Sequence, residues 1–307
     1  MSHMAETILL AFANIALVLA LSPLFEGILR KVTARIQSRQ GPPIWQSYYD
    51  LLKLLGKEDI ESGEVPVMQR FAAYLSLATI LSVALLVPMG SRVPLQSGGD
   101  AILLIYLLTL SGISCLIAAL AAGSTYSLVG MSREMMAMMT LEPLLAVAIV
   151  IGAIHTGSLR LDDVLGGSLY GNGAFPWAGL IMLGVLVFSL QAFLGRVPFD
   201  TAEAETEIME GPVMEYSGPK LALFKYARMA KMFVYSALFV SLFAPWGNGL
   251  FYPLSLLIFL AKVFGVVLMV TLIAATHARY RIDQAVRYYA GLFVLSLVAL
   301  VFAVKGF

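Results

Sequence analysis

The chain has 307 residues, of which 60% are hydrophobic and only 13% are charged. Soluble domains are about half apolar and about a quarter charged, so this composition excludes a soluble globular protein and predicts an integral membrane protein. The net charge of +1 argues against nucleic acid as a partner. The single cysteine, Cys115, cannot form an intrachain disulfide and cannot by itself hold an iron–sulfur cluster.

The apolar runs of this sequence are about 20 residues long, which suits helices that cross a bilayer, whereas barrel strands would be shorter and would alternate. We therefore predict an all-α integral membrane protein in which residues 1–307 form a single transmembrane domain. About eight transmembrane helices are expected, at residues 6–29, 71–90, 101–122, 134–155, 176–195, 221–245, 251–276 and 286–304.

Lysine and arginine are concentrated on one side of this predicted bundle. The loops that follow odd-numbered spans hold 16 of the 20 basic residues, whereas the other side holds three and Lys262 lies within a span. Cytoplasmic loops carry the excess of basic residues in membrane proteins. The long loops 30–70 and 196–220 are therefore predicted to be cytoplasmic, and both termini are predicted to lie on the non-cytoplasmic side.

The first of these loops contains a helical pattern of its own. Apolar residues recur there at helical spacing, namely Ile44, Tyr48, Leu51, Leu52 and Leu55. Trp45, Tyr48 and Tyr49 add aromatic rings of the kind found at membrane interfaces. We predict an amphipathic helix in the headgroup region. The alternative is a helix that docks a partner protein without touching lipid.

Several charged residues lie at or inside predicted spans, where they are expensive and usually functional. Glu134 and Glu142 lie eight residues apart in the fourth span, so waters or a third carboxylate could bridge them, and Pro143 is expected to kink the helix. Lys262 lies near the middle of the seventh span and is expected to face a polar cavity or a carboxylate, with Glu142 as the candidate. Static ion pairs are the alternative interpretation for Glu142 and Lys262.

The loop 196–220 is the most acidic part of the chain. If the loop is helical, Glu203, Glu207 and Glu210 share one face and titrate as a coupled set, while Glu205 points away. Such carboxylates beside hydrocarbon indicate proton or sodium chemistry, or an interface, and the alternative is a merely solvated face. This loop holds six of the 19 acidic residues: Asp200, Glu203, Glu205, Glu207, Glu210 and Glu215.

These loops resemble the signature of a known family. The pattern P-F-D-x-x-E-A-E-x-E runs from Pro198 to Glu207, and A-R-x-x-x-R-x-G-P runs from Ala34 to Pro42. Arg133, Glu142 and Lys262 also match charged positions of the family. The chain thus resembles the membrane subunit shared by respiratory complex I (its subunit 1, or H) and the energy-converting membrane-bound nickel–iron hydrogenases.

Other residues distinguish the two branches of that family. The segment E-G-P-x-x-E-Y-S-G from Glu210 to Gly218, together with Ser132-Arg133-Glu134, is similar to the hydrogenase branch of the formate hydrogenlyase type. The complex I branch typically has an apolar or small residue at position 210, no proline at position 212, and an alanine–glutamine pair in the fourth span. These departures argue against a quinone site.

By this resemblance, the chain is the membrane anchor and ion-translocation coupling subunit of a hydrogenase complex in the prokaryotic cytoplasmic membrane. The resemblance implies no cofactor on this chain. The nickel–iron centre and the iron–sulfur clusters would belong to the large and small subunits of a peripheral arm. Antiporter-like membrane subunits would be further partners.

Residue chemistry and resemblance together predict three groups of functional residues. The predicted proton or ion relay comprises Glu134, Glu142, Asp200, Glu203, Glu205, Glu207, Glu215 and Lys262. Arg133 and Arg196 are predicted to tune its charge. The predicted docking residues for the peripheral arm are Arg35, Arg39, Gly41, Pro42, Glu210 and Tyr216.

Three other functions remain open on the sequence alone. The first is the quinone-site membrane subunit of a complex I-like NADH or ferredoxin dehydrogenase, which would have a quinone chamber against residues 198–217. The second is a stand-alone ion-coupled transporter, which predicts internal repeats and broken helices that the sequence does not display. The third is a purely structural anchor whose partners carry all the ions.

Overall fold

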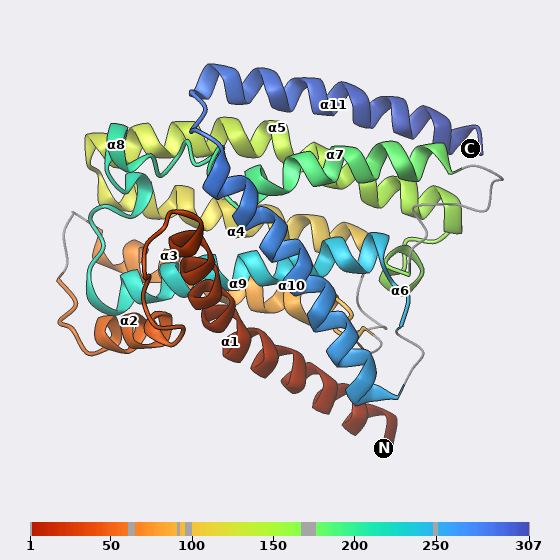
Figure 1. The fold of residues 1–307 in the computed structure, drawn as a ribbon, viewed down its shortest axis with the longest axis horizontal. Coiled ribbons are helices and arrows are strands. Elements are labelled where there is room, and N and C mark those ends of the chain that lie inside the picture. The colour runs from red at the N-terminus through yellow and green to blue at the C-terminus, as the bar shows by residue number, and fades with distance from the viewer. Residues whose placement is uncertain are drawn as a thin grey trace.

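The computed structural model describes residues 2–60, 65–90, 93–95, 100–166, 176–247 and 251–306, without the side chains of residues 2–6, 205 and 252. Within these residues the fold is helical (Figure 1). The long helices are α1 (Ser2–Ile36), α3 (Pro66–Leu86), α4 (Ala101–Ala122), α5 (Thr125–Thr156), α7 (Trp177–Phe193), α9 (Gly218–Phe243), α10 (Tyr252–Thr276) and α11 (Ile282–Val304). The short ones are α2 (Gln46–Leu55), α6 (Leu161–Val164), α8 (Glu205–Ile208) and the 3₁₀ turn η2 (Gly211–Val213).

A helix overlaps each of the eight predicted spans, and six of these helices are long and apolar enough to cross a membrane. The other two are α7, which has only 17 residues, and α9, which carries four basic residues between Lys220 and Lys231. The all-α, multi-pass character is therefore confirmed for the described residues. The number of eight spans remains a prediction, because length and composition support six.

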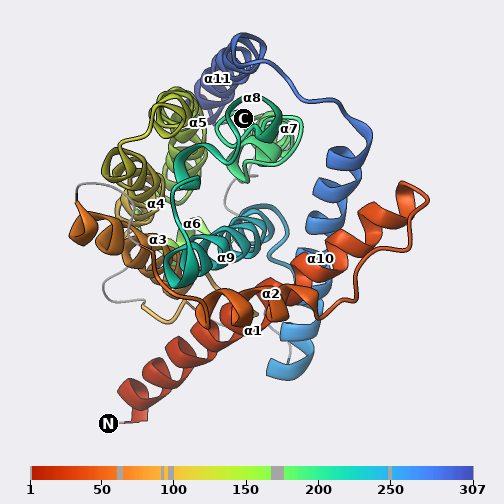
Figure 2. The ribbon, with the colours of Figure 1, turned by 90° about the vertical axis from the view of Figure 1, so that its left-hand side faces the viewer.

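Helix α9 lies at the centre of the bundle (Figure 2), where it packs against α1, α3, α7 and α10. Its middle section is completely enclosed: Ala230, Phe233, Val234 and Ala237 have no exposed surface. Alanine and serine recur along the helix, and small residues let neighbouring helices approach closely. Basic residues on α9 are consequently held inside the molecule.

Two long helices begin or end well away from the predicted boundaries. Helix α1 continues to Ile36, so Arg30 and Arg35 belong to a helix and not to a loop. Helix α5 begins at Thr125, where the Ser124 side chain caps it by accepting a hydrogen bond from the backbone N–H of Ser127. Arg133 therefore lies inside α5 rather than at its end. Apolar composition cannot locate such boundaries, since helices extend beyond the hydrocarbon.

Helix α2 forms within the first long loop and packs along α1. Gly27 of α1 makes this possible, because a Cβ there would lie 1.9 Å from the carbonyl oxygen of Ile44. Within α2, the side chain of Leu51 is buried and that of Tyr49 is 60% exposed. Trp45, just before the helix, is 58% exposed. A helix is present where the sequence predicts one, and its amphipathic placement in the headgroup region remains a prediction.

The two long loops meet at one end of the molecule, with α2 and α8, and both termini lie toward the other end (Figure 1). Contacts between the loops fix this end. Lys220 lies 3.1 Å from Asp59, and the backbone N–H of Ile60 donates to the Ser217 hydroxyl at 3.3 Å. The acidic loop is thus held between α5 and the first loop, which positions it over the interior of the bundle.

Candidate functional site: a charged cavity beside the central helix

The acidic loop folds inward instead of forming one continuous helix. Phe199, Ala202 and Ile208 are buried, and the loop contains only the single turn α8 followed by η2. Met209, between the two, has a φ of +57° that interrupts any helix. The expectation that Glu203, Glu207 and Glu210 share one helical face is therefore wrong, since Glu203 precedes α8 and Glu210 follows the interruption.

The turn η2 packs against the start of α5, which fixes the second half of the loop. The Ser127 hydroxyl donates to the carbonyl of Pro212 at 3.2 Å. A Cβ at Gly130 would lie 2.7 Å from Cδ of Pro212, so the loop approaches α5 where α5 has no side chain. The G-P pair that distinguishes this chain's loop thus has a packing role on α5.

The loop closes a cavity of about 190 Å³ against α4, α5, α7 and α9. Such a volume has room for several waters. Five predicted residues line it: Glu134, Glu142, Asp200, Glu203 and Glu210. Carboxylates from α5 and from the distant acidic loop therefore share one polar interior, which is the arrangement that a proton relay requires.

Three basic residues of α9 line the same cavity: Lys225, Arg228 and Lys231. They recur every third residue, so they follow one side of the helix. Arg228 pairs with Glu203, and the ammonium group of Lys231 lies 5.6 Å from the ring centroid of Tyr235. In the sequence, Lys225, Arg228 and Lys231 served only to predict how the chain is oriented in the membrane. Their three-residue spacing puts them on one side of a helix, and this signal could have identified them as site residues.

Glu134 and Glu142 extend the cavity along α5. The carboxyl of Glu142 interacts with the Thr109 hydroxyl of α4, and Glu134 lies one turn before Met138 on the same lining. Helix α5 continues through Pro143, which follows Glu142 directly. The proline leaves the backbone carbonyl four residues earlier in α5 without its usual donor.

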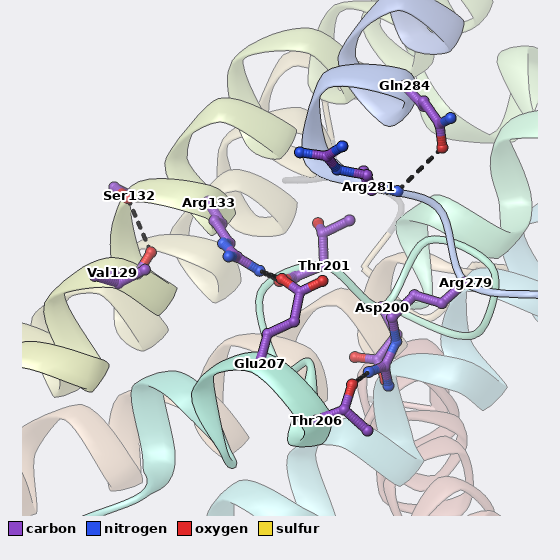
Figure 3. Close-up of polar contacts among 10 residues, drawn as sticks. All are labelled: Val129, Ser132, Arg133, Asp200, Thr201, Thr206, Glu207, Arg279, Arg281 and Gln284. Atoms are coloured by element: carbon purple, nitrogen blue, oxygen red, sulfur yellow. Dashed lines mark hydrogen bonds and ion pairs between the residues drawn. The ribbon is translucent and has the colours of Figure 1, made fainter.

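The acidic loop is also held by two arginines from distant parts of the chain (Figure 3). Arg133 of α5 pairs with Glu207 and donates to the carbonyl oxygen of Thr201 at 3.2 Å. Arg279, in the α10–α11 connection, pairs with Asp200 at 2.9 Å. Burial raises the pKa of Asp200, and Arg228 and Arg279 oppose that rise by favouring the charged carboxylate. Burial is the larger influence, so the pKa of Asp200 remains above its ordinary value.

Arg196, at the start of the loop, makes an ion pair that sequence reasoning missed. Its partner is Glu26 of α1, whose side chain is only 9% exposed, and Glu26 also lies 3.6 Å from Arg30. Arg30 in turn pairs with Asp50 of α2 at 2.8 Å. A chain of alternating charges thus connects α2 to the acidic loop. Glu26 is acidic and lies inside a predicted span, which was the available signal.

Lys262 has different neighbours from those expected. Its ammonium group donates to the carbonyl oxygens of Ala244, at 2.8 Å, and Trp246, and lies 3.9 Å from the ring centroid of Trp246. These contacts are at the end of α9, and Glu142 is not among them. The suggested Lys262–Glu142 pair is therefore corrected: the lysine caps carbonyl groups that α9 leaves free at its C-terminus.

The predicted docking residues divide into two groups. Arg35 and Arg39 are exposed, and Gly41 and Pro42 follow them with a φ of +69° at Gly41. Tyr216, in contrast, is only 6% exposed and donates to the carbonyl of Ala118 at 2.9 Å, so its ring anchors the loop inside the chain.

The remaining acidic residues of the loop have less defined positions. Glu210 is exposed at the edge of the cavity, and Glu215 is half-buried. The side chain of Glu205 lies outside the described residues. Among the residues described, no group of three or more His, Cys, Asp or Glu side chains is placed to hold a metal ion.

A family model described as NADH dehydrogenase matches residues 8–304, nearly the entire chain. The chain belongs to the NADH dehydrogenase family. The match begins within α1 and ends at the last residue of α11, so it includes every long helix and the acidic loop. The cavity and its charged lining therefore lie within the part of the chain that matches the family model.

Similar proteins come from hydrogenase and respiratory complexes. Hydrogenase-4 component C of Escherichia coli is 35% identical over 280 residues, which cover 89% of each chain. Formate hydrogenlyase subunit 4 of the same organism is 33% identical, covering 87% of this chain and 90% of the relative. An NADH-quinone oxidoreductase subunit of Anaplasma phagocytophilum is 30% identical, and the match covers 84% of each chain.

A solved structure has the same fold. A chain of the membrane-bound sulfane sulfur reductase, an archaeal respiratory membrane complex, superposes with a TM-score of 0.86 at 27% identity. The match covers 97% of this chain and 99% of that one. Members of this family thus occur as subunits of multi-subunit oxidoreductase complexes, and this chain has the fold of such a subunit.

Proposed function

We propose that this chain is the membrane anchor and ion-translocation coupling subunit of a multi-subunit energy-converting nickel–iron hydrogenase. The similarity to Hydrogenase-4 component C and formate hydrogenlyase subunit 4 supports the hydrogenase assignment. The single observation that carries the coupling role is the cavity in which carboxylates from α5 and the acidic loop meet the basic side of α9. The nickel–iron centre and the iron–sulfur clusters reside in the large and small subunits of a peripheral arm.

The proposed arrangement in the membrane has eight spans, with α7 and α9 added to the six longer apolar helices. Burial of α9 by its neighbours makes its basic residues tolerable within the bilayer. Both termini lie on the non-cytoplasmic side, and α2 lies in the headgroup region. The end that carries α2 and α8 then faces the cytoplasm and contacts the peripheral arm.

Within this arrangement, the cavity residues pass a change of charge into the membrane. Glu203 is paired with Arg228, so protonation of Glu203 leaves the guanidinium group free to attract another carboxylate of the cavity. Water between Glu203, Glu134 and Glu142 can carry the proton along α5, since these side chains line one volume. Antiporter-like membrane subunits receive the resulting change. The transferred ion is H⁺ or Na⁺.

The alternative function, a quinone-site subunit, has one observation in its favour and a stronger one against it. The cavity does lie against the loop 198–217, where a quinone chamber would be expected. Pockets for apolar cofactors are lined mainly by hydrophobic and aromatic side chains with few polar groups. Apolar side chains such as Leu108 and Phe193 also line this cavity, but five carboxylates and three basic groups around about 190 Å³ exceed the few polar groups of such pockets and favour ions and water.

Replacing one cavity carboxylate tests the proposal. We expect Glu142→Gln, in inverted membrane vesicles with the assembled complex, to reduce hydrogen-linked ion pumping by at least about tenfold, because the amide cannot carry a proton. Ion uptake is measured with a pH-sensitive dye and, for Na⁺, with ²²Na⁺. The matched control is Asp163→Asn, which removes an exposed carboxylate of α6 far from the cavity. Unchanged pumping in an assembled Glu142→Gln complex would remove this residue from the mechanism.

A further inference from the structure

A second cavity, of about 480 Å³, lies between α1, the segment 37–43 and α10, and Arg196 forms part of its wall. It is separate from the charged cavity beside α9, because the two share no lining residue. The relay as proposed does not use this space. Its contents must therefore be inferred from its own lining.

The lining carries more positive than negative charge. Three guanidinium groups, those of Arg30, Arg39 and Arg196, surround it, whereas Glu26 is its one carboxylate. Glu26 pairs with both Arg30 and Arg196, and Arg30 has Asp50 as a second partner. Arg39 differs from these two, because its guanidinium contacts only the amide oxygen of Gln37 within the described part of the chain. The cavity therefore offers an uncompensated cation to an anionic ligand.

Apart from Thr33 and Thr271, the rest of the lining carries no polar side chain, which restricts the kind of anion. Leu29 of α1 and Val270 and Ala274 of α10 form this part of the wall. Both helices are candidate membrane spans, so we expect the gap between them to face lipid. A small hydrated anion would gain nothing from these side chains. The combination fits an amphipathic molecule with an anionic head.

Neighbouring aromatic residues place the cavity at headgroup depth. Trp45 and Tyr49 of α2 are both more than half exposed, and α2 follows directly after the segment that lines the cavity. Tryptophan and tyrosine are enriched where the hydrocarbon meets the headgroups. Arginine matches phosphate oxygens with two parallel hydrogen bonds, so a phosphodiester at this depth is a suitable partner for Arg39.

We propose that this cavity binds the phosphate headgroup of an anionic phospholipid. Arg39 is its principal contact, a role that replaces the docking of the peripheral arm predicted for this residue from the sequence. The glycerol and the upper part of an acyl chain lie against Leu29, Val270 and Ala274. The lipid would occupy the gap between α1 and α10 beside the Glu26–Arg196 pair. It would thus be a structural ligand next to the acidic loop, at a position where removal of lipid exposes buried charges to water.

Lipid binding to the purified full-length chain tests this assignment. The chain is delipidated, and the number and affinity of bound lipids are measured by native mass spectrometry with added phosphatidylglycerol or phosphatidylcholine. We expect a preference for phosphatidylglycerol, and we expect Arg39→Gln to weaken its binding by about tenfold, the effect of losing one hydrogen-bonded charge. Arg39→Lys should restore only part of the affinity, because the ammonium group cannot bind the phosphate with two parallel bonds.

A neighbouring arginine provides the matched control. Arg35→Gln removes the same charge four residues earlier, from an exposed position outside the cavity lining, and should leave the affinity unchanged. A second variant, Ala274→Phe, fills the cavity without altering charge and should also release the lipid. Equal weakening by Arg35→Gln and Arg39→Gln would overturn the proposal. Equal binding of phosphatidylcholine, or displacement of the lipid by millimolar inorganic phosphate, would overturn it as well.

Discussion

At the scale of single residues, the ion pairs of this chain differ sharply in how far they are removed from water. The Glu26 side chain is 9% exposed and its partner Arg196 is 27% exposed, whereas Glu207, the partner of Arg133, is 45% exposed. Removing one member of a buried pair leaves the other without compensation, while exposed pairs contribute little. The buried pair should therefore dominate the electrostatic contribution to stability.

Glu26→Gln is expected to destabilise the chain by about 3 kcal/mol, because Arg196 and Arg30 both lose a charged acceptor. Thermal unfolding of the purified chain in detergent provides the measurement. Glu207→Gln, the exposed counterpart, should cost less than about 1 kcal/mol. The double variant Glu26→Gln/Arg196→Gln should recover part of the loss. Equal effects of Glu26→Gln and Glu207→Gln would contradict this interpretation.

These ion pairs also show which parts of the candidate site could be predicted from the sequence and which could not. The acidic residues of the loop could be identified as unusual, because carboxylates beside apolar spans are rare. The Arg196–Glu26 pair could not, since Glu26 of α1 lies 170 positions from Arg196, which follows α7, and only the tertiary fold brings them together. Lys262 was misplaced for the same reason: no spacing rule relates it to the carbonyls that end α9.

At the scale of an element, the ion pair between Asp50 of α2 and Arg30 of α1 attaches α2 to α1. The effect of pH on this pair can be measured through the stability of the chain. Burial tends to raise the pKa of Asp50, but hydrogen bonds from Arg30 and Gln46 outweigh this and lower it below its ordinary value. A carboxyl with a lowered pKa in the folded chain contributes stability above its unfolded pKa of about 3.9 and loses it as the pH falls through the folded value.

Comparison of the wild type with Asp50→Asn tests this attachment. We expect the variant to have a lower melting temperature at pH 7 and at pH 5, by an amount that is nearly the same at both. The difference should shrink as the pH falls below about 4, because the carboxyl becomes neutral first in the unfolded chain and, at lower pH, in the folded chain. Melting in detergent at pH 7, 5 and 3 provides the measurement. A difference that persists in full at pH 3 would exclude the carboxylate as its cause.

The sequence predicted helices well where a long apolar run suits a lipid environment. It predicted the structure poorly where contacts with other parts of the chain determine the conformation. The runs that became α4, α10 and α11 are apolar enough to be recognised without any partner. The interior of the acidic loop was not recognisable in this way, because Met209 and the close approach of Pro212 to Gly130 interrupt it. Lys225, Arg228 and Lys231 were counted with the cytoplasmic loop although the predicted span 221–245 includes them, since a buried helix with charges has the composition of neither a span nor a surface helix.

At the scale of the whole molecule, the first loop and the acidic loop form one continuous surface, because they are in close contact at Gly218. This residue has a φ of +54°, and a Cβ there would lie 2.5 Å from the carbonyl oxygen of Glu58. Any side chain would therefore push the first loop away from the acidic loop. The surface that we assign to the peripheral arm depends on their contact.

Gly218→Ala is expected to cost about 1–2 kcal/mol from the left-handed backbone alone, with a further penalty from the clash. More of the peripheral arm should then be lost when membranes that contain the complex are washed. Quantitative immunoblotting of the membrane fraction measures this loss. Gly184→Ala is the control, because its Cβ meets no atom within 4 Å. Full retention of the arm by Gly218→Ala would show that docking does not need the joined loops.

Arg196 has a position that joins the two cavities. It contributes to the wall of one, while its chain neighbour Gly195 and the nearby Phe199 contribute to the wall of the other. Free-energy coupling between two binding events is reciprocal. If a lipid headgroup alters the orientation of Arg196 and so changes proton affinity in the acidic loop, protonation there must change lipid affinity by the same factor. The composition of the bilayer would then act as an effector of energy conversion.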